Sequence, residues 1–192
     1  MTTILYGSTT SPYVRRIRLL LEDSDYQFEP VNVYEQTARQ AFSDISPIRK
    51  LPVLKIDDNV IYDSGVISQY WLMQTGADPL TVQQHNLISA VDAATDSLII
   101  IMQSKNSGLT VDESKLFYDL QIGRVEACFD WLETQAEQGA FAQWDYPTIA
   151  LLTLVGWVEF RQLRDLSVYP AIEAALAPFA NRPSVLATVP QA

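Results

Sequence analysis

Short apolar runs alternate with amphipathic segments over the first 76 residues, and this pattern predicts a small mixed α/β unit. The expected strands cover 3–6, 27–33, 53–56 and 60–62, and the expected helices cover 12–22, 37–42 and 64–75. Asp57-Asp58-Asn59 lies between the last two strands and predicts the turn of a β-hairpin. Gly76 follows the last helix, where a C-terminal cap belongs. The predicted order is therefore strand, helix, strand, helix, strand, strand, helix.

Beyond residue 82 the pattern changes to long helical repeats without strands. Helices are expected over 82–105, 112–138, 145–163, 170–179 and 183–188. Phe117, Leu120 and Trp131 share a stripe of the second helix, and the third is apolar on nearly all sides, which predicts the buried centre of a helical domain. The predicted domains are 1–76 and 83–192, joined by a linker at 77–82.

The charge balance limits the partners of this chain. The formal net charge is −10 and the sequence pI is about 4.4, so neither nucleic acid nor an anionic membrane is an expected partner. The single cysteine, Cys128, and single histidine, His85, exclude an intrachain disulfide and a metal site rich in these residues. The N-terminus lacks a signal-peptide pattern and the apolar runs are shorter than a membrane span, so a cytoplasmic protein is expected.

The segment Ser11-Pro12 carries the candidate chemistry. It places a hydroxyl at the start of an amphipathic helix, with proline at the first helical position. A helix start carries free N–H groups and partial positive charge, so it favours an anion, and a hydroxyl beside it can stabilise a thiolate. Ser11 is the candidate donor and Thr10 the nearest competitor. The alternative is that Ser11 only caps the helix.

Four short segments, in order, resemble motifs of the cytosolic glutathione S-transferases. They are Ser11–Arg16, Ser46–Leu54, Tyr62–Tyr70 and Arg182–Thr188. The first is similar to the serine-type motif of the tau class and the related omega motif, in which cysteine precedes proline. The resemblance covers the whole chain and implies an α/β thioredoxin-like N-terminal domain followed by an all-α C-terminal helical domain.

Two segments depart from the family pattern. Before the proline, Ser46 and Arg49 stand where the family often has asparagine and glycine, and Arg49 adds a charge near the expected carboxylates of the ligand. Asp145 and Thr148 hold the helix-start positions of the family's buried helix in exchanged order, which we interpret as structural because either can satisfy N–H groups there.

The resemblance implies a glutathione site in the first domain. Pro52 is expected to be cis and the backbone of Val53 to bind the cysteinyl part, the alternative being a trans proline at a strand start. Ser64 is expected at the γ-glutamyl carboxylate and Asp63 at its ammonium, the alternative being a plain helix cap. Lys50 is expected at the glycine carboxylate, with Arg39 and Arg49 as further candidates. The alternative is that Lys50 is an ordinary solvated charge.

Tyr13, Met102 and Phe117 are the candidates for the pocket of the second substrate. The implied function is activation of the glutathione thiolate for attack on small apolar electrophiles, as in detoxification, by a homodimer that uses glutathione as co-substrate and no metal. Two alternatives stay open: a non-catalytic binding or regulatory protein of the same fold, and a glutathione-dependent isomerase or peroxidase. A thiol-disulfide oxidoreductase is disfavoured because no cysteine lies near Ser11.

Overall fold

The structure, a computed structural model, describes residues 2–191 and divides into two compact units. The first unit contains the chain up to Pro79 together with the segment from Asn181 onward, and the second runs from Leu80 to Ala180. The C-terminal segment thus groups with the first unit, although the sequence pattern assigned it to the helical domain. The predicted domain boundaries at 76 and 83 remain predictions, because a division into two compact units does not show that either unit folds by itself.

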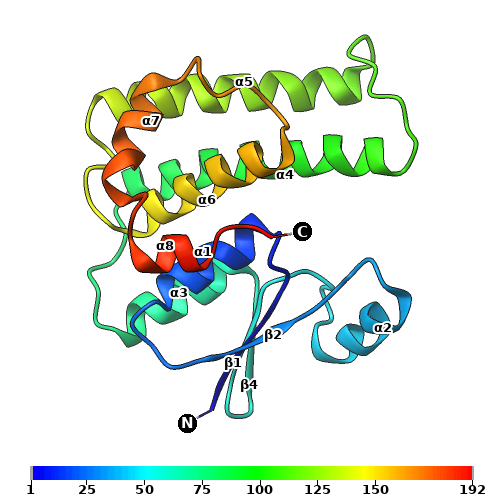
Figure 1. Cartoon of the computed structure of the whole chain (residues 1–192), viewed down its shortest axis with the longest axis vertical. Coiled ribbons are helices and arrows are strands. Elements are labelled where there is room, and N and C mark those ends of the chain that lie inside the picture. The colour runs from blue at the N-terminus through cyan, green and yellow to red at the C-terminus, as the bar shows by residue number, and fades with distance from the viewer. Residues whose placement is uncertain (1, 192) are drawn as a thin grey trace. The chain divides into compact units, whose positions relative to one another are not determined.

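The first unit has the predicted order of strands and helices. Its elements are β1 (Thr3–Gly7), α1 (Pro12–Leu20), β2 (Gln27–Pro30), α2 (Gln36–Ile45), β3 (Val53–Ile56), β4 (Asn59–Tyr62), α3 (Ser64–Gln74) and α8 (Pro183–Ala187). The sheet order is β2-β1-β3-β4, with β1 parallel to β2 and antiparallel to β3, and with β3 antiparallel to β4. Helices α1 and α3 lie side by side, whereas α2 lies apart from them (Figure 1). The expected second strand is shorter than predicted, since it ends at Pro30 rather than at Val33.

The core of this unit joins the sheet to α1 and α3. Leu5, Val14, Leu54 and Ile67 are fully buried. A Cβ atom on Gly7 would lie 2.3 Å from Cγ1 of Val14, so glycine at the end of β1 permits the close approach of α1. This packing fixes where α1 begins.

Helix α8 is held to α1 by a buried arginine. Arg15 donates from Nη2 to the carbonyl oxygen of Val185 over 3.1 Å and from Nε to Oγ1 of Thr188 over 3.4 Å. Arg182 forms an ion pair of 2.8 Å with Glu22, which follows α1. These contacts explain why the C-terminal segment belongs to the first unit and why Arg15 is not available at the surface of α1.

The second unit is entirely helical over the residues that the structure describes. Its elements are α4 (Val82–Asn106), α5 (Leu116–Glu137), α6 (Tyr146–Arg161), α7 (Pro170–Leu176) and the 3-10 turn η1 (Ala177–Phe179). Helix α4 packs against α5 and α6, and α5 packs against α7 (Figure 1). Leu151, Leu154 and Trp157 of α6 are buried, which confirms the predicted centre of the helical domain.

Helix α4 corrects the expectation that every apolar run is shorter than a membrane span. By length and composition, α4 is the one helix of residues 2–191 that could cross a membrane. Core helices meet the same criterion, and the apolar residues Leu87, Val91, Ala94 and Leu98 of α4 are buried. These residues form the face of α4 that packs in the helical unit, and 39% of the apolar window is buried.

The apolar stripe predicted on α5 is not the buried face of this helix. Phe117, Leu120 and Trp131 are 55%, 51% and 37% exposed. The buried face lies one position further along and includes Tyr118, Val125, Phe129 and Leu132. The helix also begins at Leu116 rather than at residue 112, because Asp112 accepts a hydrogen bond of 3.0 Å from the N–H of Ser114 in a turn that competes with helix. Both faces carry apolar residues at helical spacing, so periodicity alone did not choose between them.

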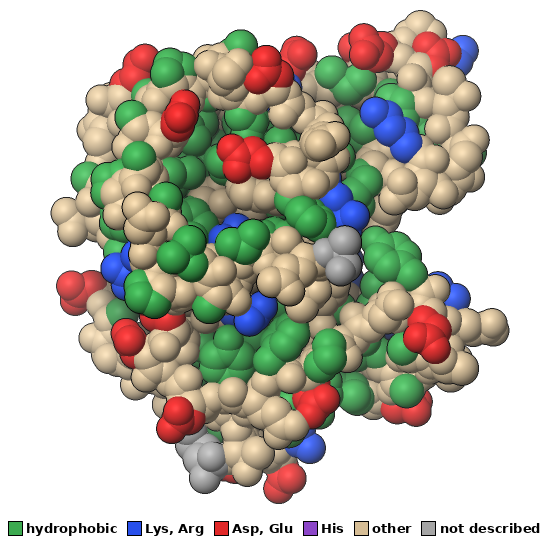
Figure 2. All heavy atoms as spheres, viewed as in Figure 1, with side chains coloured by type: hydrophobic (Ala, Val, Ile, Leu, Met, Phe, Trp, Pro, Cys, Tyr) green, Lys and Arg blue, Asp and Glu red, His purple; other side chains and the backbone are tan. Residues whose placement is uncertain are grey.

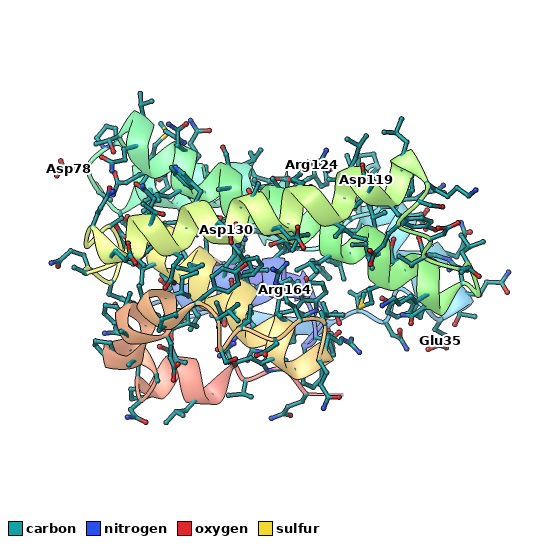
Figure 3. The ribbon with its side chains drawn as sticks, turned by 90° about the horizontal axis from the view of Figure 1, so that it is seen from above. Glu35, Asp78, Asp119, Arg124, Asp130 and Arg164 are labelled. Carbon is teal, nitrogen blue, oxygen red and sulfur yellow. The ribbon has the colours of Figure 1, made fainter. Side chains whose placement is uncertain are left out.

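Tyr169 links two elements of the helical unit. Its hydroxyl donates to Oδ1 of Asp130 on α5 over 3.1 Å and accepts from Nη2 of Arg164 over 2.9 Å. Arg164 also stacks over the rings of Phe129 and Tyr169. Figure 3 labels Asp130 and Arg164, which lie on α5 and in the segment after α6. Burial, followed by the hydrogen bond to Asp130, raises the pKa of Tyr169.

We predict that Tyr169→Phe lowers the free energy of unfolding by about 1–2 kcal/mol at neutral pH, because Asp130 and Arg164 lose a partner. A raised pKa favours the neutral phenol in the folded state, so this contribution is complete below the unfolded pKa of about 10 and is lost as pH rises through the higher folded value. Urea unfolding of wild type and variant at neutral and alkaline pH tests this. The difference in unfolding free energy between wild type and variant should decrease at alkaline pH. A difference that increases there contradicts the assigned role of the Tyr169 hydroxyl.

Candidate functional site

The start of α1 is built as the sequence predicted. Ser11 is the N-cap, with φ −88° and ψ 127°, and its Oγ accepts a hydrogen bond of 3.3 Å from the N–H of Val14. Pro12 occupies the first helical position. The cap uses a lone pair of the hydroxyl, so its proton is still available for donation to a ligand. Capping and thiolate donation are therefore compatible roles for Ser11.

The neighbouring hydroxyls are engaged with other groups. Oγ1 of Thr10 lies 3.1 Å from Oγ of Ser8, and either can donate to the other. Thr9 donates to the carbonyl oxygen of Gln191 over 3.2 Å. The hydroxyl of Thr10 thus has a partner in Ser8 and that of Ser11 has one in the N–H of Val14, so the choice between the two candidate donors stays a prediction.

The sheet register brings the three N-terminal motifs to one end of the sheet. Val53 pairs with Tyr6 on one side and with Tyr62 on the other. Tyr6 lies near the end of β1, which leads to Ser11, and Tyr62 leads directly to Asp63. The peptide bond between Leu51 and Pro52 is cis, as expected, and it immediately precedes Val53. Pro52 and Val53 are both buried.

Asp63 and Ser64 form the start of α3. Asp63 is the N-cap, and its Oδ1 accepts a hydrogen bond of 2.8 Å from the N–H of Gly65. Its φ of 71° is a left-handed conformation that aspartate tolerates better than most residues. Ser64 is 5% exposed, whereas Asp63 is exposed. An exposed carboxylate beside a buried hydroxyl at a helix start suits a ligand that carries both an ammonium and a carboxylate group.

The expected basic residues are placed on the surface. Lys50, Arg49 and Arg39 are all exposed. Arg49 adopts a φ of 51°, so this residue takes the left-handed conformation that the family's glycine would adopt more easily. Arg39 donates to the carbonyl oxygen of Val33 over 3.5 Å. Acidic side chains are scattered over the visible face in Figure 2 rather than gathered into one patch.

The candidates for the second pocket fall in different units. Tyr13 belongs to α1, where its ring lies 4.8 Å from the guanidinium carbon of Arg16. Met102 lines a cavity of the helical unit, and Phe117 is exposed at the start of α5. A pocket shared by these three side chains therefore stays a prediction.

Cys128 lies outside this constellation, on α5. It is half-buried rather than fully buried, and burial raises the pKa of its thiol while Arg124, labelled on the same helix in Figure 3, lowers it. No three His, Cys, Asp or Glu side chains of residues 2–191 are grouped to hold a metal ion.

We predict that iodoacetamide alkylates Cys128 more slowly than it alkylates the unfolded chain at mildly alkaline pH, because the thiolate is the reactive form. Arg124→Gln should slow the reaction further, by roughly threefold, since it removes the positive charge that favours the thiolate. The measurement is the alkylation rate against pH. A faster reaction in the variant contradicts the assigned role of Arg124.

Comparison with known proteins agrees with this geometry. Residues 5–79 match the family model described as the glutathione S-transferase N-terminal domain. The structure superposes on a glutathione S-transferase from Methylobacillus flagellatus solved with glutathione bound, with a TM-score of 0.87, 23% identity, and coverage of 99% of this chain and 100% of that one. The fold is that of the glutathione S-transferases. A thioredoxin-like sheet unit and a helical unit are both present, as the sequence predicted.

Curated relatives are more distant. The chain is 26% identical to the uncharacterised GST-like protein YibF of Escherichia coli K12, over 83% of each chain. It is 25% identical to a probable maleylacetoacetate isomerase of Caenorhabditis elegans, over 96% of this chain and 91% of that protein. The N-terminal match and these two relatives agree with the fold, and the tau or omega class stays a prediction.

Sequence reasoning missed two cations of the helical unit, Lys105 and Arg161. Both line the same cavity as Met102. They lie 56 positions apart in the sequence, and only the packing of α4 against α6 makes them neighbours. No local pattern in the sequence indicated this pair.

Proposed function

We propose that this protein is a glutathione transferase that binds glutathione on its thioredoxin-like unit and activates the thiol at the start of α1. Ser11 would donate a hydrogen bond to the thiolate. The backbone of Val53, after Pro52, would hold the cysteinyl part, and Ser64 and Asp63 would hold the γ-glutamyl end. Lys50 would pair with the glycine carboxylate. The homodimer, the cytoplasmic location and a role in detoxification, inferred from the resemblance, are part of this proposal.

The register of the sheet is the observation that carries the proposal. Tyr6, Val53 and Tyr62 lie side by side, so the starts of α1 and α3 and the edge after Pro52 occur at one end of the sheet. Two helix starts and a strand start at one end provide donors for an extended anionic peptide. The glutathione bound in the Methylobacillus protein, which shares the fold, supports the same ligand class.

Thiol activation supplies the chemistry. A free thiol has a pKa of roughly 8.5 and is mostly protonated at neutral pH. A decrease of about two units corresponds to roughly 2.7 kcal/mol of preferential stabilisation of the thiolate. A hydroxyl hydrogen bond and the partial positive charge of a helix start can together supply this amount. In conjugation, the sulfur then forms a bond to an electrophilic carbon while the π bond or leaving group at that carbon accepts the electron pair.

Isomerisation is the second candidate, favoured by the similarity to the probable maleylacetoacetate isomerase. There the thiolate would add to a double bond and leave again after rotation, so glutathione would be regenerated. The glutathione site is the same in both reactions, and the difference lies in the fate of the sulfur.

Measuring the fate of glutathione separates the candidates. The purified chain is first titrated with glutathione by calorimetry, then incubated with glutathione and a panel of aryl halides, unsaturated ketones and cis-unsaturated acids. Loss of glutathione in equal molar amount with product supports conjugation, and product without loss of glutathione supports isomerisation. Absence of glutathione binding overturns the proposal and favours a non-catalytic protein of this fold.

A further inference from the structure

The segment that follows α8 returns to the loop between β1 and α1. It runs from Thr188 to Gln191 and belongs to the first unit, as α1 does. Thr188 and Pro190 are buried, so the segment is packed against this unit. In Figure 1 the red end of the chain lies beside the dark blue loop that leads into α1. A segment far along the sequence therefore reaches the place where the candidate thiolate donor lies.

This returning segment contacts the chain on both sides of Ser11. Before Ser11, Oγ1 of Thr9 donates to the carbonyl oxygen of Gln191 over 3.2 Å. After it, Nε of the buried Arg15 donates to Oγ1 of Thr188 over 3.4 Å. The backbone N–H of Arg15 donates to the carbonyl oxygen of Ser11 over 3.0 Å, so this side chain projects from the first turn of α1. The two contacts thus flank the residue that the proposed function assigns as thiolate donor.

The other hydrogen bonds of the loop before α1 are local. The N–H of Ser11 donates to the carbonyl oxygen of Ser8 over 3.1 Å, and Oγ of Ser8 lies 3.1 Å from Oγ1 of Thr10. Bonds between near neighbours keep a turn compact, but they do not fix its direction relative to the rest of the unit. The bond between Thr9 and Gln191 spans 182 positions, so it holds this loop from outside.

The ordinary explanation of these contacts is stability, because a returning segment buries the surface of α1. A further attachment of the same part of the chain separates this explanation from a role in the site. Arg182, just before α8, forms an ion pair of 2.8 Å with Glu22, which follows the other end of α1. Loss of this ion pair loosens the returning chain far from Ser11. Stability alone predicts similar effects at either end of α1, whereas positioning predicts that the contacts beside Ser11 change the chemistry.

We propose that the segment Thr188–Gln191 positions the hydroxyl of Ser11 in the glutathione site. Thr9 and Arg15 are the positioning residues through which the segment acts. The inference rests on the proposed function, because the direction of this hydroxyl affects the chemistry only if Ser11 donates to the glutathione thiolate. The strength of such a bond depends on its distance and angle. A shift of about 1 Å in a positioned group can lower a rate by about a hundredfold, so a contact that fixes the helix start acts on the rate through geometry.

The test measures kcat, KM for glutathione and the pH midpoint of the bound thiolate in single variants of the full chain. Thr9→Val removes the donor to Gln191, and Thr188→Val removes the acceptor of Arg15. Each should lower kcat by about three- to tenfold and raise the midpoint toward that of free glutathione, with KM changed less than about twofold. Thr9→Ser keeps the hydroxyl and should restore the wild-type values. Arg182→Gln is the matched control and should leave kcat and the midpoint unchanged.

Circular dichroism and hydrogen exchange of the Val14 and Arg15 amides accompany each variant, because both amides donate to Ser11. Their exchange should be faster in Thr9→Val and Thr188→Val than in Arg182→Gln. Equal losses of kcat in these three variants, or unchanged midpoints in folded Thr9→Val and Thr188→Val, overturn the positioning role. If wild type binds no glutathione, the proposed function fails, and the exchange rates decide the rest. Faster exchange confined to the two variants beside Ser11 then supports the hold of the segment on the helix start, and unchanged exchange overturns it.

Discussion

Replacement of Ser11 by alanine is expected to lower glutathione-dependent turnover at neutral pH by roughly one to two orders of magnitude, because the thiol pKa returns toward that of free glutathione. The affinity for glutathione should change little, since the peptide contacts assigned to Val53, Asp63 and Ser64 are retained. The effect should therefore appear in kcat rather than in KM for glutathione. Steady-state kinetics over a range of pH measure it, and the loss should shrink as the pH rises past the pKa of the free thiol.

A second substitution separates thiolate donation from helix capping. Ser11 accepts a hydrogen bond from the N–H of Val14, so alanine also removes a cap, at about 1 kcal/mol of stability. Glycine at an N-cap costs only a few tenths of a kcal/mol. Ser11→Gly should thus be nearly as stable as wild type and nearly as slow as Ser11→Ala. Full activity in Ser11→Gly would assign Ser11 to the cap alone, and a large loss in Thr10→Ala instead would move the donor to Thr10.

The largest effect on stability is expected at Asp145. Its Oδ1 accepts a hydrogen bond of 3.1 Å from the N–H of Thr148 at the start of α6, and its Oδ2 accepts one of 3.1 Å from Nε2 of Gln84. Gln84 is part of the capping box that begins α4 with Thr81. Asp145→Ala should therefore lower the free energy of unfolding by about 2–4 kcal/mol, or Tm by roughly 5–10 °C, because it removes one helix cap and a link to a second.

Asparagine at position 145 is the matched control. Its side-chain oxygen can still accept from the N–H of Thr148, so most of the cap is retained and the loss should be less than half of that of Asp145→Ala. Thermal unfolding followed by circular dichroism compares the three proteins. Equal losses in the two variants would show that the negative charge, rather than the cap, carries the stabilisation. The exchanged order of Asp145 and Thr148 relative to the family pattern is thus compatible with a structural role.

Local chemistry explains which parts of the fold were predictable. The period of the apolar residues predicted each strand and helix of the first unit, and turn residues such as Asp57 and Asp58 marked the hairpin. Asp63 caps α3, and Gly76 has the positive φ expected after the end of this helix. These features depend on neighbours within a few residues, so the sequence contains the needed information.

Long-range packing explains the rest. Phe117 and Tyr118 are adjacent apolar residues, and only the contacts of α5 decide that Tyr118 is buried while Phe117 is exposed. Arg15 belongs to a run of basic residues on α1, yet the return of α8 buries it against Val185. Lys105 and Arg161 are separated by 56 positions and meet only at the cavity of the helical unit. Such pairs leave no periodic signal in the chain.

The pH titration of thiolate absorbance, with glutathione saturating the purified protein, tests the central proposal most directly. The measurement is made on wild type, Ser11→Gly and Thr10→Ala. We predict a midpoint well below that of free glutathione in wild type and Thr10→Ala, and a midpoint near that of free glutathione in Ser11→Gly. An unshifted midpoint in wild type, or no bound thiolate at any pH, would contradict activation of glutathione by this protein.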